Sequence, residues 1–196
     1  ALLRRGFQPE AFREMAITSG LTKTDIVVGW ENLEGINRKI IDPLARRAMV
    51  VVDPVKISIE GGPARKSAEL PVHPDFPKRR VRKVPVELGS IWISREDWED
   101  LNRAEFRLIG LGNIVLEGKK ARWTGDKIVR GMQKIQWVSE PHIPVRILRP
   151  LLEAKGLGEP GLGKLKVGSL VQMERVGFGR IDRIAGKEVT VVFAHR

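Results

Sequence analysis

The sequence contains no cysteine, which excludes disulfide bonds, thiolate catalysis and cysteine-ligated zinc. It also contains no tyrosine, and its five tryptophans and six phenylalanines supply few side chains for stacking on a ligand. No apolar run approaches the roughly 20 residues that span a bilayer, and no signal peptide precedes the first predicted helix. These absences predict a cytoplasmic protein with no membrane partner, and the lack of cysteine is compatible with a reducing compartment.

Acidic residues are also scarce relative to basic ones. The 35 lysines and arginines exceed the 24 aspartates and glutamates, so the net charge is +11 and the isoelectric point is near 10.3. Such an excess favours a polyanionic partner, either nucleic acid or an acidic membrane surface, although a soluble protein can simply be basic. The cations gather around predicted strand ends and loops, where guanidinium groups can meet phosphates and splayed bases. We therefore predict an RNA-binding set that consists of Arg46, Arg47, Lys78, Arg79, Arg80, Arg82, Lys83, Arg103, Arg107, Lys119, Lys120 and Arg122.

The spacing of apolar residues changes from helical to strand-like between residues 44 and 59. Before it, helices are predicted over residues 9–18 and 30–42, and Pro43 ends the second one. After it, Val55, Ile57 and Ile59 alternate with polar residues, as in a strand. Residues 64–77 read as a loop, and short strands separated by glycine turns follow. Trp30 is expected to be a buried helix anchor, and Phe106 and Trp123 are candidates for stacking on a base.

The predicted fold is mainly β, with a small N-terminal helical unit followed by two antiparallel β-barrels. We expect the helical unit at residues 1–44, a proximal barrel at 45–138 and a distal barrel at 139–196. It stays open whether the last strands return to the proximal barrel. The sequence shows no exact internal repeat.

No stretch predicts a catalytic or metal site. Residues 158–164 have the spacing of a phosphate-binding loop, but Leu165 stands where a magnesium-binding Ser or Thr is needed, so we interpret them as a flexible turn. The acidic cluster from Glu96 to Asp100 follows the capping residue Ser94 and is typical of a helix start. The three histidines have no metal-binding spacing.

Motifs over nearly the whole chain carry a resemblance to a known family. They include Leu3-Arg4-Arg5-Gly6-Phe7, Leu33-Glu34-x-Ile36-Asn37-Arg38-Lys39-Ile40-Ile41-Asp42-Pro43, Arg47-Ala48-Met49, Asp53-Pro54-Val55-Lys56, Ile135-Gln136-Trp137-Val138-Ser139 and Val171-Gln172-Met173-Glu174-Arg175. Together they resemble the archaeal-type glutamyl-tRNA synthetases, class I enzymes related to the glutaminyl-tRNA synthetases. The ending of the second helix, Ile40 to Pro43, resembles the glutamyl branch.

The resemblance implies the C-terminal, anticodon-binding part of a glutamate–tRNA ligase, inactive alone because the catalytic motifs are absent. ATP and magnesium are implied for the parent enzyme and no cofactor for this chain. The implied partners are glutamate tRNA, with glutamine tRNA open, and the parent's catalytic domain. Arg47 matches a base-contacting arginine of the glutaminyl relatives, and Arg107 occupies another such basic position, whereas a third falls at Glu117 or Gly118.

Two alternatives stay open at the level of sequence. One is a free-standing RNA-binding β-barrel protein, and the other is a protein-interaction module of a multi-synthetase assembly, in which the basic surface serves acidic proteins.

Overall fold

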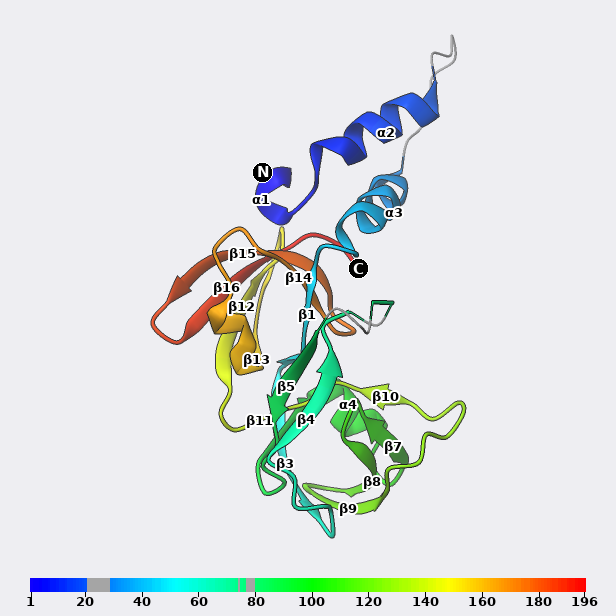
Figure 1. Ribbon diagram of the computed structural model, residues 1–196, viewed down its shortest axis with the longest axis vertical. Coiled ribbons are helices and arrows are strands. Elements are labelled where there is room, and N and C mark those ends of the chain that lie inside the picture. Colours follow the sequence, from blue (N-terminus) through cyan, green and yellow to red (C-terminus); the bar gives the residue numbers. More distant parts are fainter. Residues whose placement is uncertain (21–28, 74, 77–79) are drawn as a thin grey trace.

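The computed structural model describes residues 1–20, 29–73, 75–76 and 80–196. A helical unit lies at one end of the molecule, one β-barrel lies in the middle, and a second β-barrel lies at the other end (Figure 1). The predicted fold class, mainly β with a small N-terminal helical unit and two barrels, is confirmed. The barrels were expected to be antiparallel, but each contains two parallel strand pairs. No helix within the described residues is long and apolar enough to cross a membrane.

The helical unit contains α1 (Leu2–Arg5), α2 (Pro9–Ser19) and α3 (Trp30–Ile41). Helix α2 begins at a proline, which is tolerated in the first turn because no intrahelical partner is lost there. Phe7, Leu33 and Ile41 form a small core that also includes Phe178 from the middle barrel. Trp30 is 57% exposed, so the prediction that it is a buried anchor is wrong.

The middle barrel, which we call the distal barrel, is a seven-stranded sheet in the order β1-β14-β15-β16-β12-β13-β2. The pairs β1–β14 and β12–β16 are parallel and the others antiparallel. A short helix, η1 (Pro160–Lys164), stands where a flexible turn was expected. The strands are β1 (Arg46–Ala48), β2 (Val50–Val52), β12 (Ile143–Leu148), β13 (Glu153–Gly158), β14 (Leu170–Met173), β15 (Gly177–Ala185) and β16 (Glu188–Phe193).

The proximal barrel lies at the end of the molecule away from the helices and is a second seven-stranded sheet, in the order β10-β7-β8-β9-β3-β6-β11. The predicted capped helix is present as α4 (Arg95–Asp100), where Ser94 Oγ accepts from the Asp97 N–H at 3.2 Å. The strands are β3 (Pro54–Glu60), β6 (Ile91–Ser94), β7 (Glu105–Leu108), β8 (Gly112–Glu117), β9 (Lys120–Gly125), β10 (Lys134–Ile135) and β11 (Val138–Ser139).

A separate hairpin, β4 (Ser67–Pro71) and β5 (Val81–Pro85), packs on the proximal barrel through Ala68, Leu70 and Val84. The expected loop at 64–77 therefore contains a strand. Charged residues and prolines at its borders hid the alternation of Ala68 and Leu70, which is only two apolar positions long.

Each barrel is closed by one extended segment whose two halves pair with opposite edges of the sheet. Strands β1 and β2 are separated by Met49 alone, yet they form the two ends of the distal sheet. Strands β10 and β11 do the same for the proximal sheet. The range expected for the proximal barrel, 45–138, differs from the observed pairing because residues 46–52 belong to the distal sheet. Strands β14 to β16 also stay in that sheet.

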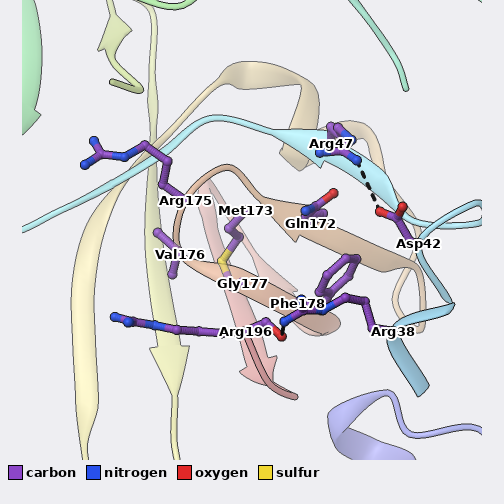
Figure 2. A pocket seen from close by; sticks show the side chains of 10 residues that line it. All are labelled: Arg38, Asp42, Arg47, Gln172, Met173, Arg175, Val176, Gly177, Phe178 and Arg196. Atoms are coloured by element: carbon purple, nitrogen blue, oxygen red, sulfur yellow. Dashed lines mark hydrogen bonds and ion pairs between the residues drawn. The ribbon is translucent and has the colours of Figure 1, made fainter. Parts of the chain in front are cut away.

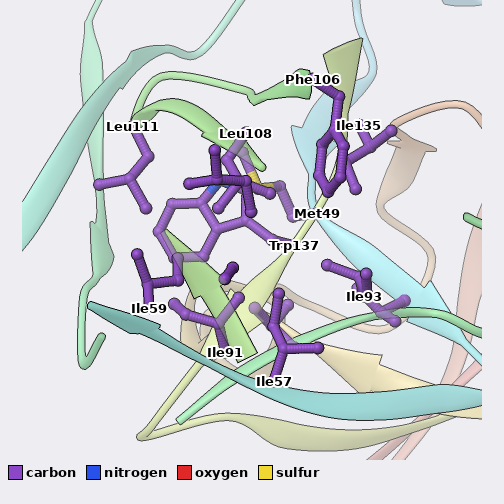
Figure 3. Packing of buried hydrophobic residues seen from close by; sticks show 14 of the residues in the cluster. Met49, Ile57, Ile59, Ile91, Ile93, Phe106, Leu108, Leu111, Ile135 and Trp137 are labelled. Carbon is purple, nitrogen blue, oxygen red and sulfur yellow. The ribbon is translucent and has the colours of Figure 1, made fainter. Parts of the chain in front are cut away.

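The apolar residues 48–52 are the shared wall of the two barrels. Ala48 and Val50 point into the distal core, whereas Met49 and Val51 point into the proximal core. Alternate residues of a strand face opposite sides, so a strand buried on both faces must be apolar throughout. Figure 3 shows Met49 beside the fully buried Trp137, whose Nε1 donates to the Ile109 carbonyl at 2.9 Å. Phe106 lies in the same core and is 0% exposed, so the prediction that it stacks on a base is wrong.

Candidate nucleic-acid interface

A pocket of about 290 Å³ lies where the end of α3 meets strands β1 and β14 (Figure 2). Its walls come from the helical unit, the first half of the distal closing segment and the β14–β15 turn. The lining residues are Arg38, Asp42, Arg47, Gln172, Met173, Arg175, Val176, Gly177, Phe178 and Arg196. We call it the arginine pocket, because four of these residues are arginines.

Strand pairing places two of these side chains next to each other. Arg47 of β1 is in register with Gln172 of the parallel strand β14, and the next pair along is Ala48 with Met173. Ala48 and Met173 are buried in the distal core. Because side chains alternate along a strand, Arg47 and Gln172 lie on the opposite face, toward the pocket.

The pocket is strongly cationic. Asp42 is the one acidic residue among its lining residues, and its Oδ1 accepts from Arg47 Nη2 at 3.2 Å. Arg38 donates to the backbone oxygen of Arg196. Arg175 follows β14 with a left-handed φ of 61°, and its Nη1 donates to Asp97 Oδ2 at 2.7 Å. Such a site attracts a ligand with negative charge or several hydrogen-bond acceptors.

Two polar atoms of the pocket residues are buried and have no hydrogen-bond partner among the described residues. They are the Nε of Arg47, a donor, and the Oε1 of Gln172, an acceptor. Nearly all buried polar groups in proteins are hydrogen-bonded, and a ligand can provide the missing partner. The pocket can therefore accept a ligand that both donates and accepts hydrogen bonds.

A second concavity of about 340 Å³ lies along the α3–β1 connection. Arg46 and Arg80 line it, together with Pro43, Leu44, Ala45, Val72 and His73. Both arginines are exposed, so the structure brings together these two members of the predicted RNA-binding set.

Asp42, His73 and Asp75 have ligand atoms within 4.8 Å of one another. His73 Nδ1 accepts from the Asp75 N–H at 3.2 Å, so a neutral ring carries its proton on Nε2. Nε2 lies 3.6 Å from Asp42 Oδ2. With its proton on Nε2, the ring has no lone pair to offer a metal on the side of Asp42, so the geometry favours a polar contact between His73 and Asp42 over a metal site.

The other predicted residues are distributed over the proximal barrel. Arg103, Lys119, Lys120 and Arg122 are exposed around the β8–β9 turn, at the end of the molecule away from the helical unit. Lys120 and Lys83 are exposed and lie 3.8 and 3.5 Å from Glu60 and Glu69. Lys78 and Arg79 lie outside the described residues.

Two further predicted arginines, Arg82 and Arg107, are held by hydrogen bonds within the protein. Arg82 is 12% exposed and pairs with Glu159 and Glu174 of the distal barrel. Arg107 Nη1 donates to Asn113 Oδ1 at 2.7 Å and to the Asp126 carbonyl at 3.0 Å. Arg107 thus anchors the β9–β10 loop, and its role in reading a base stays a prediction.

Four residues of the arginine pocket were not predicted as site residues: Arg38, Gln172, Arg175 and Arg196. Gln172 and Arg175 stand in one motif that carried the resemblance and Arg38 in another, and these motifs were the available signal. The proximity of Gln172 and Arg175 to Arg47 depends on the parallel pairing of β1 with β14, across more than a hundred residues of chain, which local patterns do not predict.

Part of the sequence matches the model of a known protein family. Residues 45–133 match the model of the anti-codon binding domain of class I tRNA synthetases for glutamate and glutamine (E and Q). Residues 45–133 belong to this anticodon-binding family. Within it, Arg47 lies inside the matched anticodon-binding domain, whereas Gln172 and Arg175 lie beyond the matched residues.

Curated relatives match the chain over its whole length. It is 38% identical to a glutamate–tRNA ligase of Pyrococcus horikoshii, 40% identical to one of Pyrococcus abyssi and 38% identical to one of Thermococcus onnurineus. Each match covers 100% of this chain and 36% of the relative. The chain therefore spans about a third of the length of these curated relatives. The resemblance to the glutamyl-tRNA synthetases is confirmed.

Proposed function

We propose that this chain is the tRNA-reading region of a glutamate–tRNA ligase and that the arginine pocket receives one unstacked anticodon base. The observation that carries the proposal is the buried Oε1 of Gln172, an acceptor without a partner among the described residues, in a pocket of arginine donors. Proteins read single-stranded RNA by splaying bases out of the loop and hydrogen-bonding their Watson–Crick edges.

The arrangement of donors and acceptors favours uracil. Uracil presents an acceptor, a donor and an acceptor along its Watson–Crick edge, so its N3–H can donate to Gln172 while guanidinium groups donate to O2 and O4. Cytosine presents a second acceptor at N3, which would face the Gln172 oxygen. The codons for glutamate, GAA and GAG, require uracil at the middle anticodon position, and so do those for glutamine, CAA and CAG. The pocket would therefore accept either tRNA, and discrimination between them would lie elsewhere.

The exposed cations supply sequence-independent affinity in this proposal. Arg46 and Arg80 beside the pocket, together with the group at the β8–β9 turn, would neutralise phosphates, because exposed cations contribute counterion release without contacting a base. Removing one of them should weaken binding to all RNAs alike.

The chain spans 36% of the length of its relatives, so we propose the ligase activity for a longer parent protein and not for this chain alone. ATP and magnesium would be needed by the catalytic domain of that parent. The residues described here would bind and orient the tRNA in the cytoplasm.

The test compares the binding of two RNA hairpins that carry the glutamate anticodon loop, with uracil or cytosine at the middle position. We expect wild-type protein to prefer uracil by about tenfold or more. Gln172→Leu removes the acceptor and should bring the preference close to one. Gln133→Leu makes the same change at an exposed position and should preserve the preference. Equal binding of both hairpins by the wild type would refute the base-reading function.

A further inference from the structure

Arg82 does not line the arginine pocket, but it connects the β4–β5 hairpin to two walls of the pocket, the segment that carries Arg47 and the β14–β15 turn. Its guanidinium group, on the β4–β5 hairpin, donates through Nη1 to Glu159 and through Nη2 to Glu174 Oε1 at 3.1 Å. The side chains of Arg82 and Glu159 are 12% and 7% exposed. This bidentate contact is a buried bridge between the hairpin and the distal barrel.

Each carboxylate partner is attached to the closing segment that carries Arg47. Glu159 Oε2 accepts from the Met49 N–H at 3.0 Å, and the Glu159 N–H donates to the Met49 carbonyl at 3.1 Å. The Glu174 N–H donates to the Ala48 carbonyl at 2.9 Å. Arg82 therefore holds the segment immediately after Arg47 through both of its carboxylate partners.

The same contacts hold the other wall of the pocket. Glu174 stands directly before Arg175, which itself reaches the proximal barrel by donating to Asp97 and, at 3.2 Å, to Gln136 Oε1. Glu174 also follows the strand that carries Gln172. A shift of Glu174 would move both the Gln172 strand and the turn that projects Arg175.

We propose that Arg82 is a positioning residue for anticodon recognition: it fixes Arg47 relative to Gln172 and Arg175, and thereby sets the discrimination between bases in the arginine pocket. This inference rests on the proposed function. Without Arg82, the carboxylates of Glu159 and Glu174 would lose the cation that they share. Burial, which raises the pKa of Glu159, shows that a negative charge at this position is unfavourable without such a partner. The β14–β15 turn would then separate from the closing segment to let water reach these carboxylates. Base edges are read at hydrogen-bond distance, so a small displacement removes the discrimination.

The test measures the ratio of uracil to cytosine affinity, with the same two hairpins, for Arg82→Met and for a matched control. Arg146→Met is the control, because Arg146 also contacts two carboxylates, those of Glu153 and Glu188, but on an exposed part of the distal barrel outside the pocket. A change in the folded fraction alters both affinities equally and leaves their ratio unchanged, so the ratio distinguishes positioning from general stability.

We expect Arg82→Met to lower the wild-type ratio of about tenfold to less than about threefold, and Arg146→Met to keep it. If Arg82→Met reduces the amount of folded protein, the double variant Arg82→Met/Glu159→Gln removes the unpaired buried charge and should fold with the same loss of ratio. A wild-type ratio of one overturns both the proposed function and this inference. A normal wild-type ratio that persists in the folded Arg82 variants overturns this inference alone.

Discussion

Asn37 Nδ2 donates to His195 Nε2 at 2.9 Å in a fully buried contact that joins helix α3 to the segment after β16. His195 Nδ1 lies 3.0 Å from the Arg196 carbonyl and donates to it when Nε2 accepts. Asn37 cannot reverse its amide without loss, because its Oδ1 accepts from the Gln8 N–H at 2.9 Å. The contact therefore requires a neutral imidazole ring.

This contact predicts a loss of stability in acid. Burial lowers the pKa of His195 from its ordinary value of 6.5. Below about pH 6.5 the unfolded chain takes up a proton that the folded state resists, so protons favour unfolding until the pH passes the lower folded pKa. Thermal unfolding followed from about pH 7 to pH 5 should show a falling Tm. His195→Gln should weaken this fall, and an identical pH dependence in both proteins would contradict the prediction.

Removal of Arg82 should also destabilise the fold. Arg82→Met leaves the carboxylate of Glu159 buried without its partner, and the expected loss in the free energy of unfolding is about 3 kcal/mol, as for other broken buried pairs. Urea unfolding measures it. Arg82→Met/Glu159→Gln should recover a large part of the loss, whereas equal stability of the single and double variants would show that the buried charge is not the cause.

Trp137 should be the most costly aromatic side chain to remove. It is fully buried in the proximal core, and Trp137→Ala should lower the free energy of unfolding by about 3 to 5 kcal/mol through lost burial and the cavity left behind. Trp30→Ala, at a position that is 57% exposed, should cost much less. Similar losses in urea unfolding for both variants would contradict the packing shown in Figure 3.

Arg107 should act as an anchor of the β9–β10 loop in protein without RNA. Its contact to the Asp126 carbonyl and the bond from Asn113 Nδ2 to the Lys127 carbonyl at 2.9 Å hold the start of that loop. Arg107→Ala should raise amide hydrogen exchange in residues 127–133, because it removes one of these restraints. Exchange in the β14–β15 turn serves as the internal reference. Unchanged exchange in the loop would leave base contact as the main role of Arg107.

The sequence predicted the elements that local patterns determine. The two long helices were predicted within about two residues, which is the usual uncertainty of element boundaries. The start of the capped helix after Ser94 was also predicted, but the helix ends at Asp100 and not at about Arg103 as expected. The anticodon-binding family was also identified from the motifs. The arginine pocket was found only in part, through Arg47, because β1 and β14 meet across a long separation in sequence.

The burial of Arg82 could not be predicted from the charge pattern of the sequence. Arg82 stands in the densest cationic run of the chain, which reads as a solvated surface. However, Val84 and Val86 are buried, and Arg82 lies two and four residues before them, so in a strand it shares their inward direction. The alternation of inward and outward side chains along a strand could have predicted that Arg82 is buried and Lys83 exposed. This prediction requires that the strand is known to begin at Val81.

The two closing segments have a wider consequence. Strands β1 and β2 precede the main strands of the proximal barrel but complete the distal one, and strands β10 and β11 precede those of the distal barrel but complete the proximal one. Apart from this exchange, both sheets follow the same sequence of parallel and antiparallel neighbours. The chain is thus a duplicated unit whose two copies have swapped their first strands, as two subunits do in a domain-swapped dimer. Unfolding of either copy removes the closing strands of the other barrel, so the two barrels should unfold in one cooperative transition.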